Sequence, residues 1–152
     1  MSHSTTRKPP PCRADFRWFQ DVPTRWMDND AFGHANNVVY YAWMDTAVNR
    51  FLIDHGLLHI TSSSVVGIVA ENGCRYLSQI AYPDDVTVGL AVVRLGHSSV
   101  RYRVGVFRNA AETASAEGHL VHVYVDRATM RPVVIPDFMR AAMQKISNHG
   151  ED

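Results

Sequence analysis

Residues 27–37 hold the chain's densest group of side chains that could take part in chemistry. They read MDNDAFGHANN and supply Asp28, Asp30, Gly33, His34, Asn36 and Asn37. A carboxylate can take a proton from water or attack a carbonyl carbon, and a histidine can orient or transfer a proton. An apolar and aromatic run follows directly, so these polar groups lie where the chain enters its core.

The run after this group predicts a long helix over residues 36–56. Asn36 or Asn37 is expected to cap its N-terminus, and Gly56 stands where a left-handed C-terminal cap belongs. Apolar side chains cover most of its circumference, and only Asp45, Thr46, Asn49 and Arg50 form a polar stripe. Such a helix is expected to be buried on several sides.

Alternating or β-branched segments predict five strands around this helix. The first covers residues 16–26, with Phe16, Trp18, Val22 and Trp26 on one face; Pro23 cannot donate a ladder hydrogen bond, which places this strand at a sheet edge. The others cover residues 64–77, 84–96, 98–109 and 113–127. Short connections make the last three an antiparallel meander, and residues 136–146 predict a short amphipathic helix.

The predicted fold class is therefore α+β, with a five-stranded antiparallel sheet wrapped around one long helix. We expect a flexible tail at 1–15, one domain at 16–146 and a C-terminal tail at 147–152. Exposed sheet edges and a helix uncovered on one side favour a homodimer or a homotetramer.

Composition narrows the function classes. Lys plus Arg and Asp plus Glu are both 15 in 152 residues, so no basic face for nucleic acid is expected. No signal peptide or membrane-spanning segment is visible, and two distant cysteines suggest neither a disulfide nor a metal site, so a cytoplasmic protein is expected. His119 and His122 point to opposite faces of a strand without a third ligand, which argues against metal.

Three segments resemble one family. RWMDNDAFGHANNVVYYAWMDTA, LGHSSVRYRV and EGHLVHVYVDRATMRPVVIP are similar, in this order, to hotdog-fold acyl-CoA thioesterases of the 4-hydroxybenzoyl-CoA thioesterase type. The resemblance covers roughly residues 16–146. It implies a hotdog fold, a site at a dimer interface, an acyl-CoA substrate, and hydrolysis by water without metal or other cofactor.

The resemblance makes Asp30, the second Asp of D-x-D, the catalytic carboxylate, as general base or as nucleophile. The start of the long helix offers unpaired amides to a developing oxyanion, and the amide of Asn37 is the expected donor. Gly33 permits a tight turn and close approach of substrate. His34 either orients the carbonyl or water or only pins the loop.

Other residues have competing interpretations. Asp28 is expected to bond the loop backbone, and Asp45 on the helix is a rival base. Ser98 and Ser99 suit a turn or ligand contact better than a nucleophile. Substrate binding is expected from Gly33, Tyr41, Ser98, Ser99, Arg101 and Arg103, the two arginines as partners for coenzyme A phosphates.

Two further functions stay open at this point. A hotdog acyl-CoA hydratase or dehydratase would share the fold but needs a differently placed His and acid pair. A non-catalytic acyl-CoA-binding dimer would have no need for Asp30. The acyl chain is expected to be fatty or aromatic.

Overall fold

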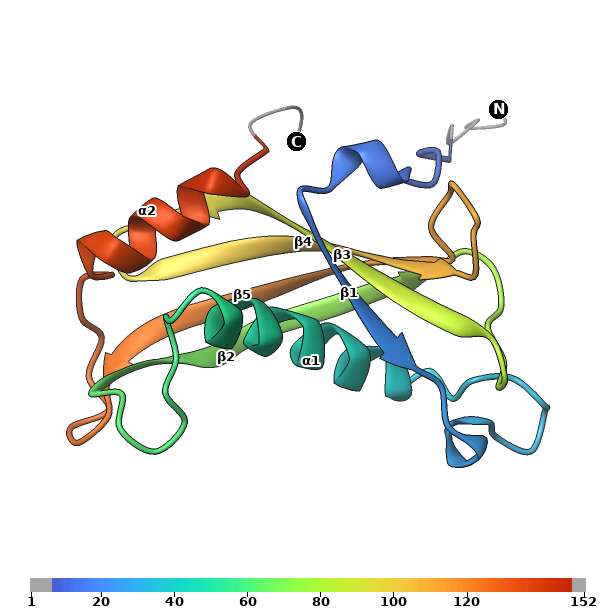
Figure 1. The fold of residues 1–152 in the computed structure, drawn as a ribbon, viewed down its shortest axis with the longest axis horizontal. Coiled ribbons are helices and arrows are strands. Elements are labelled where there is room, and N and C mark those ends of the chain that lie inside the picture. Colours follow the sequence, from blue (N-terminus) through green and yellow to red (C-terminus); the bar gives the residue numbers. More distant parts are fainter. Residues whose placement is uncertain (1–6, 149–152) are drawn as a thin grey trace, which may run out of the picture.

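The fold is that of a computed structural model, which describes residues 7–148 (Figure 1). Along the chain lie the 3-10 helix η1 (Arg13–Asp15), β1 (Trp18–Pro23), the 3-10 helix η2 (Trp26–Asp28), α1 (Val39–Asp54), β2 (Val65–Tyr76), β3 (Asp85–Leu95), β4 (Ser99–Arg108), β5 (Ala116–Asp126) and α2 (Asp137–Lys145). The bounds of β2 to β5 lie within three residues of those predicted from alternation.

The strands form one antiparallel sheet in the order β1-β3-β4-β5-β2. The predicted meander of the last three strands is confirmed, and β1 lies at an edge, where Pro23 interrupts no inner ladder. The other edge is β2, whose pairing with β5 is interrupted between Val69 and Glu71. With α1 packed against this sheet, the predicted α+β hotdog fold is confirmed.

The main core lies between α1 and the sheet. The helix buries Tyr40, Trp43, Met44, Ala47, Val48, Phe51 and Leu52. These positions recur every three or four residues, so a single subunit buries α1 along one face. For a single subunit, the expected burial on several sides was therefore wrong. Val38 and Ile53 are exposed. Met139 and Met143 of α2 join the same core beside β3.

Two local expectations at the ends of elements were also wrong. Helix α1 begins at Val39 with Val38 as its N-cap, and no side chain of the described residues caps it. Trp26 leaves the first strand for η2 and is 81% exposed, so it does not share the buried face of Val22.

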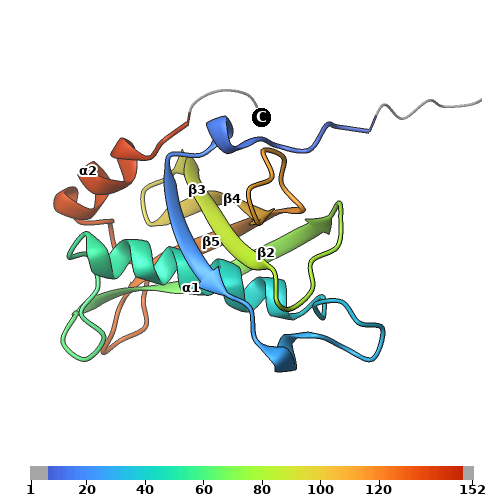
Figure 2. The same cartoon turned by 45° about the vertical axis from the view of Figure 1, so that its right-hand side comes forward.

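A smaller apolar cluster lies on the other face of the sheet, and the N-terminal segment runs along this side, away from α1 (Figure 2). It contains Phe16, Ala91, Phe107 and Ala114. The packed part of the chain extends beyond residues 16–146, because Cys12 pairs with Thr113 and Ser147 with Val92. The division into tails and one domain stays a prediction. Among residues 7–148, no helix is long and apolar enough to cross a membrane.

Candidate active site

Asp28 fixes the loop that carries the candidate residues. Its side chain is 1% exposed and accepts hydrogen bonds from the backbone amide of Arg25 at 2.7 Å and from the Arg25 guanidinium at 2.9 and 3.0 Å. Its carbonyl oxygen accepts from the amide of Asn36 at 2.8 Å. A buried carboxylate with so many donors is a structural anchor, as expected from its position.

Asp30 occupies the first position of a tight turn that ends at Gly33. The amide of Gly33 donates to the Asp30 carbonyl oxygen at 3.1 Å, and Gly33 has a φ of 81°, which a glycine adopts without steric cost. The amide of Phe32 donates to Asp30 Oδ1 at 2.8 Å. No residue in 7–148 donates to Oδ2, so the carboxylate is oriented by one oxygen and presents the other.

A cavity of about 510 Å³ lies beside this turn. Its lining comes from the loop, the start of α1 and the segment after β2: Asp30, Phe32, His34, Ala35, Asn37, Tyr40, Tyr76, Leu77, Ser78 and Gln79. The structure therefore brings together three predicted residues, Asp30, His34 and Asn37. Tyr41 is half-buried against the main core and does not line this cavity.

The chain enters α1 through a side-chain turn. Asn36 Oδ1 accepts from the amide of Val38 at 3.2 Å, and the Asn36 carbonyl accepts from the amide of Val39 at 2.9 Å. Asn36 thus satisfies an amide ahead of the helix instead of capping it. The amide of Asn37 donates to no residue in 7–148, which leaves it for a ligand or water in the cavity.

Tyr76 is a residue of this cavity that sequence reasoning missed. Its hydroxyl donates to the carbonyl oxygen of Asn37 at 2.8 Å, and its ring meets that of Tyr40 edge to face at 5.0 Å. Burial, with Cys74 and Tyr41 nearby, raises the pKa of Tyr76 to about 12, so the hydroxyl remains a donor at neutral pH. No local pattern signals this contact, because it depends on where the end of β2 meets the start of α1.

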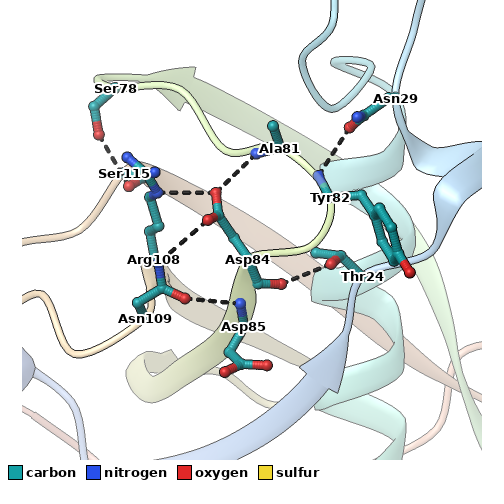
Figure 3. Close-up of polar contacts among 10 residues, drawn as sticks. All are labelled: Thr24, Asn29, Ser78, Ala81, Tyr82, Asp84, Asp85, Arg108, Asn109 and Ser115. Atoms are coloured by element: carbon teal, nitrogen blue, oxygen red, sulfur yellow. Dashed lines mark hydrogen bonds and ion pairs between the residues drawn. The ribbon is translucent and has the colours of Figure 1, made fainter.

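A polar network around Asp84 holds the loop that follows the cavity-lining residues 76–79 (Figure 3). Asp84 Oδ2 accepts from the amide of Ala81 at 3.0 Å and pairs with Arg108 Nε at 2.8 Å. Burial alone would raise the pKa of Asp84, but the bonds from Ala81, Asn109 and Arg108 outweigh it and lower that pKa. The carboxylate therefore stays charged and keeps the loop before β3 in place.

The same network joins that loop to the segment ahead of Asp30. Thr24 donates to the Asp84 carbonyl oxygen at 2.6 Å, and the amide of Tyr82 donates to Asn29 Oδ1 at 3.0 Å (Figure 3). The amide of Ala35 donates to the Ile80 carbonyl oxygen at 2.8 Å. Two loops far apart in sequence are thereby fixed on either side of the cavity.

The other predicted binding residues lie elsewhere in this chain. Ser98 lies in the connection between β3 and β4 and Ser99 begins β4, next to α2, where Arg140 donates to the carbonyl oxygen of Gly96 at 2.9 Å. That connection is near the C-terminal end of α1, whereas Asp30 precedes its start (Figure 1). Ser98 and Ser99 therefore do not reach Asp30 within one chain.

Arg101 and Arg103 line a second cavity, of about 450 Å³, on the sheet face away from α1. The predicted placement of both arginines on one face of a strand agrees with their alternation with the fully buried Tyr102. They do not line the cavity of Asp30.

The other candidate side chains, Asp45, His119 and His122, lie outside the lining of the Asp30 cavity. Asp45 is exposed on α1, and its Oδ1 accepts from Asn49 at 3.2 Å. His119 contacts Glu71, whereas His122 is buried between Tyr102 and Tyr124. Residues 7–148 contain no group of three His, Cys, Asp or Glu side chains placed to hold a metal ion.

The chain resembles known proteins in both sequence and structure. The sequence pattern of the Thioesterase-like superfamily matches residues 22–143. The chain is similar to the crystal structure of the PA5185 protein from Pseudomonas aeruginosa strain PAO1, with 43% identity, a TM-score of 0.91, and coverage of 94% of this chain and 100% of that chain. A comparison with curated proteins found no match.

Two further solved structures share the fold. The PA2801 protein from Pseudomonas aeruginosa is 28% identical, with a TM-score of 0.77 and coverage of 82% of this chain and 96% of that chain. The BH1999 gentisyl-coenzyme A thioesterase is 21% identical, with a TM-score of 0.74 and coverage of 83% and 99%.

Proposed function

The chain belongs to the Thioesterase-like superfamily, and from that premise we propose that it hydrolyses the thioester of an acyl-CoA to the free acid and coenzyme A. The observation that carries this proposal is that Asp30, His34 and Asn37, whose amide has no hydrogen-bond partner in residues 7–148, line one cavity near the start of α1. The finer assignment to the 4-hydroxybenzoyl-CoA thioesterase type is part of the same proposal.

Asp30 supplies the activated nucleophile in one of two ways. As a general base, it takes a proton from water, the hydroxide adds to the thioester carbon, the C–S bond breaks and the thiolate leaves as coenzyme A. As a direct nucleophile, a carboxylate oxygen adds to that carbon and expels the thiolate, and water then cleaves the mixed anhydride. The bond from Phe32 to one oxygen leaves the other oxygen for either role.

The amide of Asn37 stabilises the oxygen that becomes negative as the thioester carbon turns tetrahedral. Unpaired amides and the partial positive charge at a helix N-terminus favour an anion, and fixed donors need no reorganisation during the reaction. Tyr76 holds the carbonyl of the same residue, which keeps the Asn37 backbone in position. His34, which lines the cavity, orients the substrate carbonyl or the attacking water.

The acyl group lies against the apolar and aromatic part of the lining. Tyr40, Tyr76 and Leu77 suit a fatty or aromatic acyl chain, and Gly33 lets the thioester approach the backbone. The similar structure named as a gentisyl-coenzyme A thioesterase gives one example of an aromatic acyl group within this fold. Tyr41 supports this lining from the adjacent core.

A second copy of the chain completes the site in this proposal. The edge strand β2 exposes Ile68 and Val69, and the segment that follows it, residues 76–79, lines the cavity. Pairing of two β2 edges would cover unpaired backbone groups and close the open side of the cavity. It also offers a route by which Ser98 and Ser99 of one subunit could contribute to the partner's substrate site. Light scattering that found an active monomer would contradict this dimer.

The decisive experiment measures thiol release from a panel of fatty and aromatic acyl-CoAs, with the Asp30→Asn variant beside the wild type. We expect release from at least one substrate by the wild type and a large loss in the variant. Absence of release from every acyl-CoA would overturn the proposed hydrolysis.

A further inference from the structure

The sheet face away from α1 has its own cavity, of about 450 Å³, which the proposed hydrolysis does not use. Side chains from β2, β4 and β5 and from the N-terminal segment surround it: Lys8, Arg75, Arg101, Arg103, Glu117 and His119. Four of these are cations, although the whole chain has a formal net charge of +0. The cavity therefore collects positive charge that the rest of the chain balances.

The carboxylate at the base of this cavity is shared between two guanidinium groups. Glu117 Oε2 accepts from Arg103 Nη2 at 3.3 Å and lies 3.7 Å from Arg75 Nη2. The second distance is too long for a hydrogen bond, and the buried Arg75 Nη2 donates to no residue in 7–148. The Arg75 side chain is 40% exposed, so this nitrogen lacks an acceptor among these residues while the guanidinium group remains accessible to an anionic ligand in the cavity.

A second carboxylate, Glu71, neutralises part of the rim. It contacts His119 Nε2 at 3.0 Å and lies 4.0 Å from Arg101. Gly73 makes room for the His119 ring, because a Cβ at that position would come within 2.5 Å of the ring. Counting only lysine and arginine as cations, four of them lie beside two carboxylates, so a surplus positive charge remains for a ligand.

We propose that this cavity binds a phosphate-bearing small molecule. Guanidinium groups match phosphate oxygens with two parallel hydrogen bonds, and a phosphate brings more than one charge to a site with more than one unmatched cation. The volume lies within the usual range of small-ligand sites. Lys8, Arg75 and Arg101 line the cavity from three different segments of the chain and would meet different oxygens of the same ligand.

The cavity of Asp30 and this anion site lie on opposite sides of the same strand. Residues 73–75 line the anion site, whereas residues 76–79 line the cavity of Asp30. Because consecutive strand residues point to opposite faces, Arg75 and Tyr76 diverge. The phosphate group comes either from a separate phosphorylated molecule or from a coenzyme A that passes around the β2 edge, and only the second source rests on the proposed hydrolysis.

Isothermal titration of the full chain with inorganic pyrophosphate tests the site. We expect saturable binding, and a loss of about tenfold or more in affinity for Arg75→Gln, the scale of one charge-assisted hydrogen bond. The matched control is Arg50→Gln, because Arg50 pairs with Asp54 on α1. It should leave the affinity unchanged. Thermal unfolding of each variant verifies that it is folded.

Competition between coenzyme A and pyrophosphate identifies the source of the phosphate group. If coenzyme A displaces pyrophosphate and pyrophosphate inhibits hydrolysis competitively, the substrate supplies the phosphate; if neither occurs, a separate molecule does. The Asp30→Asn variant should bind pyrophosphate like the wild type even if no thioester is hydrolysed. No saturable binding at millimolar pyrophosphate, or equal affinity for wild type, Arg75→Gln and Arg50→Gln, would overturn the site.

Discussion

The two faces of the sheet treat polar side chains differently. On the face under α1, three polar atoms are buried with no hydrogen-bond partner in residues 7–148: His122 Nδ1 and the hydroxyls of Tyr102 and Tyr124. On the opposite face, Arg103 and Glu117 form a partly exposed ion pair. Burial lowers the pKa of His122 to about 4 and raises the pKa of both tyrosines. All three are therefore neutral at pH 7. The inner layer accepts polar groups only without charge, and the outer face keeps its charges where water reaches them.

The cavity of Asp30 is the exception on the α1 side. It lies near the start of α1, where the half-buried Asp30 keeps contact with solvent and the amide of Asn37 has no partner in residues 7–148. The anion site on the other face has the opposite composition, with cations at its rim and base and no carboxylate free to act as a base. The proposed hydrolysis on one face and the proposed anion binding on the other agree with this division.

The largest expected effect comes from removing the charge of Asp30, which the proposed hydrolysis uses. Asp30→Asn should lower turnover by about a hundredfold or more, the scale of a lost general base, while acyl-CoA binding persists or tightens. Steady-state and single-turnover thiol release measure both quantities.

Asp45→Asn is the matched control, because Asp45 is an exposed carboxylate on α1 whose side chain bonds Asn49 and no other residue in 7–148. It should retain turnover at equal thermal stability. If Asp45→Asn abolished turnover and Asp30→Asn remained active, the helix carboxylate would be the base and the comparison drawn above would fail.

The second expected effect is a pH dependence of stability that comes from His122. Its pKa is about 4 in the folded chain and about 6.5 when unfolded, so between these values only the unfolded chain binds the proton. The free energy of unfolding should be full above pH 6.5 and decrease by about 3 kcal/mol as the pH falls to 4. Denaturant titrations across this range measure the slope.

His122→Phe removes the titrating group and should flatten that slope, whatever its stability at pH 7. His97→Gln, at an exposed histidine of the connection between β3 and β4, should keep the wild-type slope. An unchanged slope in His122→Phe would mean that the inner layer tolerates a charge, contrary to the contrast between the two faces.

A smaller effect is expected where the edge strand meets the start of α1. Tyr76→Phe removes the hydroxyl that donates to the Asn37 carbonyl oxygen, which loosens the proposed oxyanion donor without removing it. Turnover should fall by about tenfold, near 1.4 kcal/mol, with little change in KM. Tyr82→Phe is the control, since no residue in 7–148 bonds the Tyr82 hydroxyl. Equal turnover in both variants would show that the Tyr76 hydroxyl does not contribute to hydrolysis.

Local pattern was sufficient to predict most of the fold. Alternation predicted β3, β4 and β5 because their inner residues are buried throughout, whereas their outer residues are partly exposed except under the small cluster of Ala91 and Phe107. Pro23 correctly marked an edge strand. The start of α1 was mispredicted because Asn36 bonds the amide of Val38 in a turn before the helix. Trp26 was misplaced because Asp28 folds its segment into η2.

The candidate site was predictable where it is local in sequence. Asp30, His34 and Asn37 lie within eight residues, so one turn brings them to the same cavity. Tyr76 and the Asp84 network could not be predicted, because their contacts depend on strand order and on loops far apart in the chain. The roles assigned to Ser98, Ser99, Arg101 and Arg103 stay predictions.

The smallest expected effect on stability lies on the outer face, at Glu71. Its contacts with His119 and Arg101 are solvent-exposed, and such pairs contribute little to folding. Glu71→Gln should therefore change the free energy of unfolding by less than about 0.5 kcal/mol.

The same substitution should nevertheless strengthen anion binding. Removing one of the two carboxylates near the cavity leaves Arg101 free to face the ligand, so pyrophosphate affinity should rise by about threefold to tenfold. Glu112→Gln is the matched control, because Glu112 is an exposed carboxylate outside the lining of that cavity. Calorimetric titration of both variants at one ionic strength measures the two affinities. A gain in affinity confined to Glu71→Gln would show that Glu71 competes with the ligand for Arg101. An equal gain in both variants would show that only the overall charge of the outer face matters and that it has no defined anion site.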